Sequence, residues 1–428
     1  MFSFYLVVAL LFVLMLLRMP VAFAMGSSAV VGLMVHFGPG PALSILERAV
    51  FEKTSSFILV AIPLFILMAE LLTAGNMTRR AIVACQAWVG HVRGGLAVAT
   101  VGSAVMLAAL VGSSTASAAT MAASAFPEMR RYNYDDRLSS AVVCVGGTLA
   151  VMIPPSIVLV VYGILTETSI GRLFIAGIVP GMLTAAGMVV TILMLSRVSG
   201  YAPAGSPFRL RSAFSESRGV WPILVLIFLV IAAIYTGAAS PTEAGALGVT
   251  GALILGLSQR VLSPNSISMG LSRAVRTTVM IVAIIFCSAI FANYLAFTQI
   301  TQGVIGAVES SGLPSWAILL LMVGMLLLLG MVLDQLAILS LTMPLAFPIA
   351  MSLGYDPVWF GIIVTKTVEI GLLTPPLGLN VYVTAGQTQL PLNTVFRGIL
   401  PFILLEIVVL IILLLFPNLT LWLPNLMW

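Results

Sequence analysis

Three ionisable residues interrupt long apolar stretches in the second half of this sequence: Asp334, Lys366 and Glu369. Charges within apolar spans are rare and are functional candidates by default. Lys366 and Glu369 are three residues apart, so on a helix they share a face and could form an ion pair. Such a pair could also serve packing alone, because each charge neutralises the other. The carboxylate of Asp334 could attract a cation or hold a turn through hydrogen bonds.

Two segments combine glycine, hydroxyl residues and paired prolines: 146-GGTLAVMIPPS-156 and 371-GLLTPPLG-378. Proline lacks an amide donor and disfavours helix in the residue before it, so each proline pair frees backbone carbonyls. Those carbonyls and the nearby hydroxyls are suitable oxygen ligands for a small cation, and opposing helix N-termini could bind a carboxylate. Alternatively, each pair only kinks its helix against a neighbour, which is common in membrane proteins.

Side chains that could support enzyme catalysis are poorly placed. Ser113 or Ser114 could act as a nucleophile only with a base within hydrogen-bond distance. His36 and His91 stand alone in or beside loops, without metal-ligand spacing. The two lysines do not follow a glycine-rich phosphate loop, and the three cysteines are not paired by spacing. We therefore expect that the chain is not an enzyme and that any pumping draws on an ion gradient or another subunit.

The composition requires that these residues lie in a membrane. Hydrophobic residues make up 61% of the 428-residue chain and charged residues only 8%, with a mean hydropathy of +1.17. Apolar runs of about 20 residues recur, each long enough to cross the hydrocarbon core as a helix. The net charge of +5 comes from basic loops that set orientation, so it does not indicate nucleic acid binding. We predict an all-α polytopic membrane protein of about 10 to 11 transmembrane helices.

Basic residues flank the apolar segment 96–126 on both sides. Three precede it and three follow it: Arg79, Arg80 and Arg93, then Arg130, Arg131 and Arg137. The positive-inside rule places both loops in the cytoplasm. The segment is too short for two full spans, which need about 40 residues. We predict a hairpin that enters from the cytoplasm and turns inside the membrane near Gly112, because one long tilted span would leave arginines outside.

Several features recur at an offset of 221 residues. The matching pairs are Phe126-Pro127 with Phe347-Pro348, Tyr134-Asp135 with Tyr355-Asp356, and Pro154-Pro155 with Pro375-Pro376. In this register Ser113 aligns with Asp334. The loops around the second copy's hairpin, 315–350, lack basic residues, so this hairpin is expected to enter from the opposite face. Two re-entrant hairpins and two broken helices in opposite orientations are typical of inverted-repeat secondary transporters.

We expect five regions along the chain. They are N-terminal scaffold spans 1–73, a first repeat 74–195 (hairpin 96–126, broken helix 138–165), a cytoplasmic connection with scaffold spans 196–276, a second repeat 277–398 (hairpin 315–350, broken helix 358–385) and a C-terminal span 399–428. The division between the halves falls in the polar stretch 197–218, which carries four basic residues: Arg197, Arg209, Arg211 and Arg218.

The sequence resembles the large membrane subunit of tripartite ATP-independent periplasmic (TRAP) transporters. The resemblance rests on motifs spread over almost the whole chain: 62-IPLF-65 with Glu70, 112-GSSTASAAT-120, 146-GGTLAVMIPPS-156, 240-SPTEAGALG-248, 330-GMVLD-334 and 369-EIGLLTPPLGLNVYV-383. The last motif is the most specific. Lys366 departs from the smaller polar residue that this resemblance leads us to expect, which suggests a different anionic substrate or a local pair with Glu369.

The resemblance implies sodium-coupled uptake of an organic acid by an elevator mechanism in the bacterial inner membrane. It also implies two protein partners, a small four-helix membrane subunit and a periplasmic substrate-binding protein. One sodium site would involve Gly112, Ser113, Ser114, Gly146, Gly147 and Pro154. A second would involve Gly330, Asp334, Gly371 and Thr374. The expected substrate contacts are Ser114, Thr115, Ser156 and Asn380.

Two other kinds of membrane protein share part of this pattern. The closer is an inverted-repeat anion symporter or antiporter that works without partners. A neighbouring gene for a four-span partner and a secreted binding protein would separate the two readings. A channel is a third possibility, and it predicts conductance without saturable uptake.

Overall fold

The fold is that of a computed structural model, which describes residues 2–73, 77–198, 201–203, 205 and 210–427. The side chain of Arg79, used above for orientation, and Arg209, one of the basic residues of the polar stretch 197–218, lie outside this description. The expected boundary after residue 73 borders an undescribed segment. Within the described residues every regular element is a helix, which confirms the all-α prediction.

The first half of the chain contains thirteen of these elements. They are α1 (Phe2–Leu16), α2 (Val21–Phe37), α3 (Pro39–Thr54), η1 (Phe57–Val60), α4 (Ala61–Thr73), α5 (Met77–Val89), α6 (Gly95–Val111), α7 (Ser114–Ser124), α8 (Phe126–Arg131), α9 (Asp136–Gly146), α10 (Leu149–Met152), α11 (Ile157–Thr166) and α12 (Ile170–Ser196).

The second half contains eleven. They are α13 (Leu210–Ser217), α14 (Trp221–Tyr235), α15 (Pro241–Ser258), α16 (Pro264–Phe297), α17 (Ile300–Ser310), α18 (Ser315–Gly330), α19 (Gln335–Ser352), α20 (Pro357–Leu373), α21 (Leu379–Thr388), α22 (Leu392–Leu415) and α23 (Asn418–Asn425).

Several helices are long and apolar enough to cross a membrane. In the described residues five meet this test, or up to seven if two bent pairs are each counted as one span. Four further apolar helices are shorter, among them α6 and α18. Short apolar helices are expected where the chain turns back or breaks at membrane depth, since neither half of a broken span reaches the full thickness.

Side-chain caps decide where several helices begin. Asp135 caps α9 by accepting from the amide of Arg137 at 2.7 Å, and Asp356 caps α20 through the amides of Val358 and Trp359. These two aspartates are 221 residues apart. An acidic side chain at this position satisfies free amide groups of the first turn and complements the positive end of the helix dipole. The repeated sequence pairs therefore mark equivalent helix starts.

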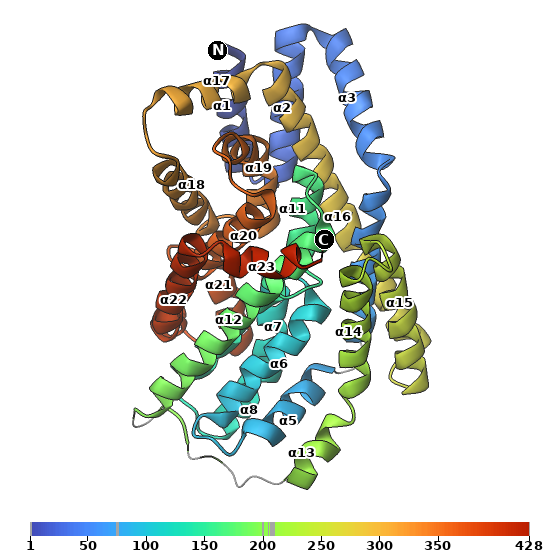
Figure 1. The fold of residues 1–428 in the computed structure, drawn as a ribbon, viewed down its shortest axis with the longest axis vertical. Helices are drawn as coiled ribbons and strands as arrows, with labels where there is room; N and C mark the ends of the chain where they lie inside the picture. Colours follow the sequence, from blue (N-terminus) through green and yellow to red (C-terminus); the bar gives the residue numbers. More distant parts are fainter. Residues whose placement is uncertain (1, 74–76, 199–200, 204, 206–209, 428) are drawn as a thin grey trace.

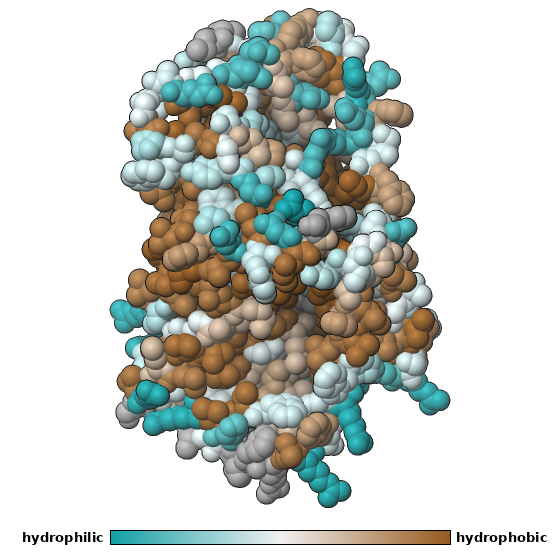
Figure 2. All heavy atoms as spheres, in the orientation of Figure 1, coloured by the Kyte–Doolittle hydropathy of each residue, from teal (hydrophilic) through white to brown (hydrophobic). Residues whose placement is uncertain are grey.

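The two hairpins lie toward opposite ends of the molecule (Figure 1). Helices α5, α8 and α13 lie at one end, where the hairpin α6–α7 is connected, and α17 precedes α18 at the other end. The helices at the first end carry several of the arginines used for orientation: Arg80, Arg130, Arg131 and Arg211. Figure 2 shows a broad hydrophobic zone between this hydrophilic end and the opposite one, as a membrane-spanning surface requires.

Helix α20 runs through the middle of the bundle. Every residue from Val358 to Leu373 is buried, and α20 packs against α12, α18, α19 and α22. A helix that is buried on all sides must satisfy any polar group it carries inside the protein. The charged residues of this helix therefore need partners from neighbouring helices.

Candidate functional site at the helix breaks

The first hairpin turns at Gly112 and Ser113, between α6 and α7. Gly112 has φ +63°, and a Cβ atom there would lie 3.0 Å from the side chain of Ile157, the first residue of α11. Glycine suits this position because it adopts the left-handed conformation without steric cost. Ser113 occupies the N-cap position of α7 in an extended conformation, and Ser114 begins the helix and is fully buried.

The first broken helix lies directly against this tip. It consists of α9, the short α10 and α11, and the hydroxyl of Ser156 caps α11 by accepting from the amide of Leu159 at 3.3 Å. A Cβ atom on Gly147 would lie only 2.7 Å from the carbonyl oxygen of Ser114. The backbone of the break and the backbone of the tip therefore approach more closely than any side chain would allow.

The second hairpin has a charged cap at its tip. Helix α18 ends at Gly330 and α19 begins at Gln335, with Asp334 between them as the N-cap. One carboxylate oxygen of Asp334 accepts hydrogen bonds from the amides of Leu336 and Ala337, at 3.0 and 3.2 Å. Of the two roles suggested by the sequence, holding the tip through hydrogen bonds is the one that these contacts document.

The second broken helix approaches this tip through glycine. A Cβ atom on Gly371 would lie 2.5 Å from the Cα of Gly330 and 3.0 Å from the carbonyl oxygen of Leu327. After α20 ends, the amide of Gly378 donates to the carbonyl of Met331 at 3.4 Å. Some carbonyls in the last turns of α18 and α20 are already hydrogen-bonded: Leu327 accepts from the amide of Met331 at 3.2 Å, and Gly371 accepts from the amide of Thr374 at 2.9 Å. The ends of α18 and α20 therefore meet backbone against backbone, in the region where the sequence predicted the second cation site.

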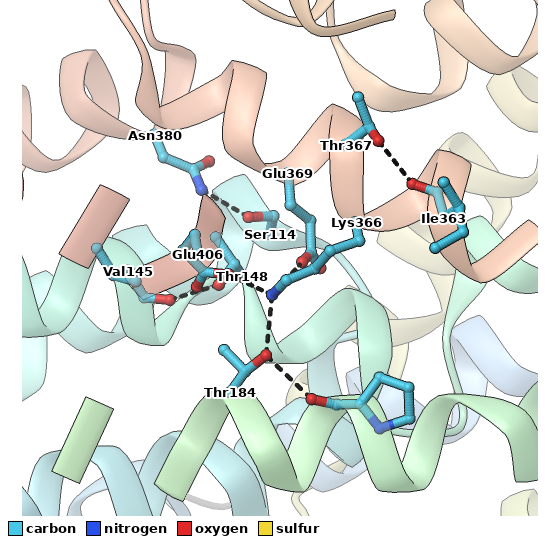
Figure 3. A network of polar contacts seen from close by, with 11 residues as sticks. Ser114, Val145, Thr148, Thr184, Ile363, Lys366, Thr367, Glu369, Asn380 and Glu406 are labelled. Atoms are coloured by element: carbon cyan, nitrogen blue, oxygen red, sulfur yellow. Dashed lines mark hydrogen bonds and ion pairs between the residues drawn. The ribbon is translucent and has the colours of Figure 1, made fainter. Parts of the chain in front are cut away.

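One hydrogen bond joins the first tip to the second broken helix (Figure 3). The side-chain amide of Asn380 donates to the hydroxyl of Ser114 at 2.6 Å, and both residues are fully buried. Ser114 is the first residue of α7 and Asn380 the second of α21, so two helix N-termini meet here. Three buried polar atoms on α7 and α21 have no hydrogen-bond partner among the described residues: Ser117 Oγ, Asn380 Oδ1 and Thr384 Oγ1.

The other residues predicted to bind sodium or substrate make fewer contacts with the hairpin tips. Gly146 lies against α6, since its Cβ would be 3.3 Å from that of Ala104. The hydroxyl of Thr115 contacts only Ser113, at 3.4 Å, among the recorded hydrogen bonds. The hydroxyl of Thr374 donates to the carbonyl of Ile370 within α20, at 2.6 Å, and Pro154 is buried at the first break. These contacts leave their proposed roles as predictions.

A cluster of buried charges lies close behind the breaks (Figure 3). The ammonium group of Lys366 lies 3.5 Å from a carboxylate oxygen of Glu369 and makes a closer ion pair with Glu406 of α22. It also donates to the hydroxyl of Thr184 in α12 at 2.9 Å. The pair of Lys366 with Glu369 was one of the sequence interpretations. Glu406 was missed, although it is the only charged residue in the apolar run 398–415, which was a usable signal.

Known proteins resemble this chain over nearly its whole length. Residues 8–419 match the family model described as the tripartite ATP-independent periplasmic transporter, DctM component. The C4-dicarboxylate TRAP transporter large permease protein DctM of Pseudomonas aeruginosa is 39% identical over 391 residues, 91% of each chain. The ectoine/5-hydroxyectoine TRAP transporter large permease protein UehC of Ruegeria pomeroyi is 31% identical over 427 residues, 97% of each chain.

A solved structure shares the fold. The YdaH transporter of Alcanivorax borkumensis superposes with a TM-score of 0.65 over 89% of this chain and 90% of that one, at 14% sequence identity. That identity supports the fold alone. The family match over residues 8–419 supports membership of the family as well as the fold. The relatives in this family are permease subunits, not enzymes. The chain belongs to the DctM family, the large membrane subunits of TRAP transporters.

Proposed function

We propose that this chain imports an organic acid, and that the carboxylate binds where α7 and α21 begin. The observation that carries the proposal is the hydrogen bond between Ser114 and Asn380, which brings two helix N-termini together. Each N-terminus has free amide donors and about half a positive charge, so the pair favours an anion. The partnerless atoms of Ser117 and Thr384 offer further hydrogen-bond donors on the same two helices.

The substrate class follows from this chemistry and from the relatives. Hydroxyl, amide and helix-terminus donors recognise a carboxylate without requiring an arginine or lysine at the contact. The names of the relatives specify C4-dicarboxylates and ectoine, which both carry carboxylate groups. Within the proposed site, the hydroxyls of Thr115, at the first tip, and Ser156, at the first break, would also contact the substrate.

We further propose that sodium drives the import. Backbone oxygens near Gly330 and Gly371 form one candidate site with Asp334 and Thr374, and the approach of Gly147 to Ser114 supports the other. Sodium bound there would neutralise nearby partial negative charge and stabilise the arrangement of tip and break. Hairpins and broken helices would move together against the scaffold helices, as in an elevator, with the two halves as inverted repeats.

The setting proposed for this cycle is the bacterial inner membrane. A small four-helix subunit would assemble with the chain, and a periplasmic protein would deliver the organic acid. Membership of a family named for its tripartite organisation supports this reading over a carrier that works alone. A channel is disfavoured because the first tip and the first break are closed by backbone contacts at Ser114 and Gly147.

The first experiment measures thermal stability of the purified chain with its small subunit in sodium, potassium and choline chloride at equal ionic strength. A ligand that binds only the folded state raises stability by mass action. We expect a saturable rise specific to sodium, which Asp334→Ala abolishes. Equal stability in all three salts would remove sodium coupling from the proposal.

The second experiment measures uptake into proteoliposomes of succinate, a C4-dicarboxylate, and ectoine, with and without an imposed sodium gradient. Each assay is run with and without a candidate binding protein from the same organism. Saturable uptake that depends on both the gradient and the binding protein supports the proposal. Uptake that proceeds equally without a binding protein would favour a stand-alone carrier, and conductance without saturation would favour a channel.

A further inference from the structure

The buried cluster of Lys366, Glu369 and Glu406 has no role in the carboxylate site proposed above. All three side chains are at most 1% exposed, and they come from two helices, α20 and α22. A third helix joins through Thr184 of α12, whose hydroxyl accepts from Lys366 and donates to the carbonyl of Pro180 at 3.0 Å. One ammonium group thus ties three helices together at the centre of the bundle.

The two ion pairs of Lys366 depend on each other, because few other charged side chains lie near them. Among the described helices packed against α20, α10, α18, α19 and α23 carry no ionisable side chain. The other basic residues of α12 and α22 are Arg172 and Arg397, about 18 Å and 13 Å along their helices from Thr184 and Glu406, at 1.5 Å per residue. Lys366 is therefore the cation that compensates both carboxylates, and they hold it in place from two helices.

The equivalent positions of the first repeat carry no charged residue. The residues 221 positions before Lys366, Glu369 and Glu406 are Val145, Thr148 and Ala185. Thr148 satisfies its hydroxyl locally by donating to the carbonyl of Val145 at 2.7 Å (Figure 3). The equivalent positions of the first repeat therefore carry no charge, so a helix break of this kind does not by itself require the cluster. A buried ion pair is weak evidence for stability, and in some proteins such pairs fix one arrangement of the packed helices.

The cluster acts on the helix that forms the second candidate cation site. Lys366 precedes Gly371 by five residues on α20, about 7.5 Å along the axis. Gly371 lies very close to Gly330, so a small shift of α20 would either pull their backbones apart or make them clash. The contacts of Lys366 with Thr184 of α12 and Glu406 of α22 therefore fix the position of α20 relative to α18, including the orientation of its carbonyl groups.

We infer that Lys366 is a positioning residue, which together with Glu406 and Glu369 holds α20 in the register needed for cation binding at Gly330 and Gly371. This inference rests on the sodium coupling proposed above. Residues that orient the direct ligands of a metal commonly change its affinity by about 10- to 100-fold when they are replaced. The cluster would then set sodium affinity without touching the ion.

The test compares sodium affinities of variants with the purified chain and its small subunit, read from thermal stability as sodium chloride replaces choline chloride. The main variant replaces the whole cluster by neutral side chains of similar size: Lys366→Met, Glu369→Gln and Glu406→Gln together. Neutral replacement of a complete buried cluster is often tolerated, because no charge is left unpaired. We expect stability without sodium to change little, and the sodium dissociation constant to rise about 10-fold or more.

A matched control and a milder variant distinguish an effect on sodium affinity from an effect on folding. Lys53→Met breaks the exposed pair of Lys53 with Glu167, 3.5 Å apart, and should leave the sodium constant unchanged. Glu406→Gln alone keeps Lys366 and Glu369 paired and should give a smaller rise in the same direction, so it answers the question if the triple variant does not fold. A purely structural cluster would alter stability in choline and leave the sodium constant as in the wild type.

The outcomes separate this inference from the proposal beneath it. A sodium-specific rise in the wild type with the same constant in the triple variant and in Glu406→Gln overturns the positioning role only. The absence of any sodium-specific rise in the wild type removes sodium coupling and the positioning role together. A raised constant in both cluster variants, with Lys53→Met unchanged, supports the inference.

Discussion

The two units, each a hairpin tip with its helix break, have the same backbone plan and different exposure at the break. In the first unit the break residues Pro154, Pro155 and Ser156 are buried, and Ser114 at the adjacent tip bonds to Asn380 of the other half. In the second unit the equivalent break segment 375–377 is exposed, and Asp334 at the tip is exposed where its equivalent Ser113 is partly buried. Equivalent positions in a repeat can thus be closed at one end of the molecule and open at the other. Only one of the two breaks is sealed in this conformation.

The chemistry of the two units differs in the same way. The first uses hydroxyls and close backbone approach, and its N-cap Ser113 makes no side-chain cap bond. The second uses charge: Asp334 caps α19 with its carboxylate, and α20 carries Lys366 and Glu369. A repeat therefore conserves where helices stop and start, while the side chains at those stops diverge. Substitutions in each unit can test these differences one at a time.

The largest effect is expected at the first tip. Ser114→Trp should abolish transport, because the side chain is fully buried against Asn380 and the backbone near Gly147, and overfilling such a site displaces the surrounding helices. Ala116→Trp is the matched control, since Ala116 is exposed on the same helix. Uptake in proteoliposomes and the elution profile of each variant are compared. Wild-type uptake by Ser114→Trp would mean that this tip is not part of the pathway.

The next effect compares the only two lysines of the chain, Lys53 and Lys366. Lys366→Met alone leaves two buried carboxylates without their cation, so we expect a loss of about 3–5 kcal/mol in the free energy of unfolding. Lys53→Met breaks a pair at the surface, in which Lys53 is partly buried and Glu167 exposed, and should cost about 0–1 kcal/mol. Unfolding midpoints measured under one set of conditions give the comparison. Equal midpoints would show that the charges of the second unit are not coupled as their distances indicate.

The smallest effect distinguishes the two N-caps. Asp334→Ala removes two hydrogen bonds at the start of α19 and should cost about 0.5–2 kcal/mol, whereas Ser113→Ala removes no cap bond and should cost less. Asp334→Asn keeps a good capping residue and removes the charge. If Asp334→Asn keeps the stability but loses the sodium-specific rise, the carboxylate acts on the cation as well as on the helix. Equal losses in Ser113→Ala and Asp334→Ala would contradict the difference between the tips.

Much of this architecture was accessible from local sequence. Glycine and the arginine clusters indicated a hairpin over 96–126, where α6 and α7 lie, and the repeated Tyr-Asp pairs marked the starts of α9 and α20. Asp334 aligned with Ser113, and both are N-caps. These features depend on backbone rules that act within a few residues, such as capping and the effect of proline on the preceding turn.

Contacts between distant segments were not accessible in the same way. The bond of Ser114 to Asn380 joins residues 266 positions apart, and the charge cluster joins α12, α20 and α22. Glu406 stood alone in an apolar run, and its partner lay 40 residues away. Helix periodicity indicates which residues share a face, but it does not indicate which helix will cover that face.

The sequence by itself determined that the chain spans a membrane as helices, where those helices break, and which family it belongs to. These properties follow from composition, from the need of buried backbone for internal hydrogen bonds, and from local turn chemistry. Only the tertiary structure decided that the first break is buried, that the second is exposed, and that Lys366 meets two carboxylates. Those outcomes depend on packing among helices distant in sequence, because close approach and buried charge pairing are properties of the assembled bundle.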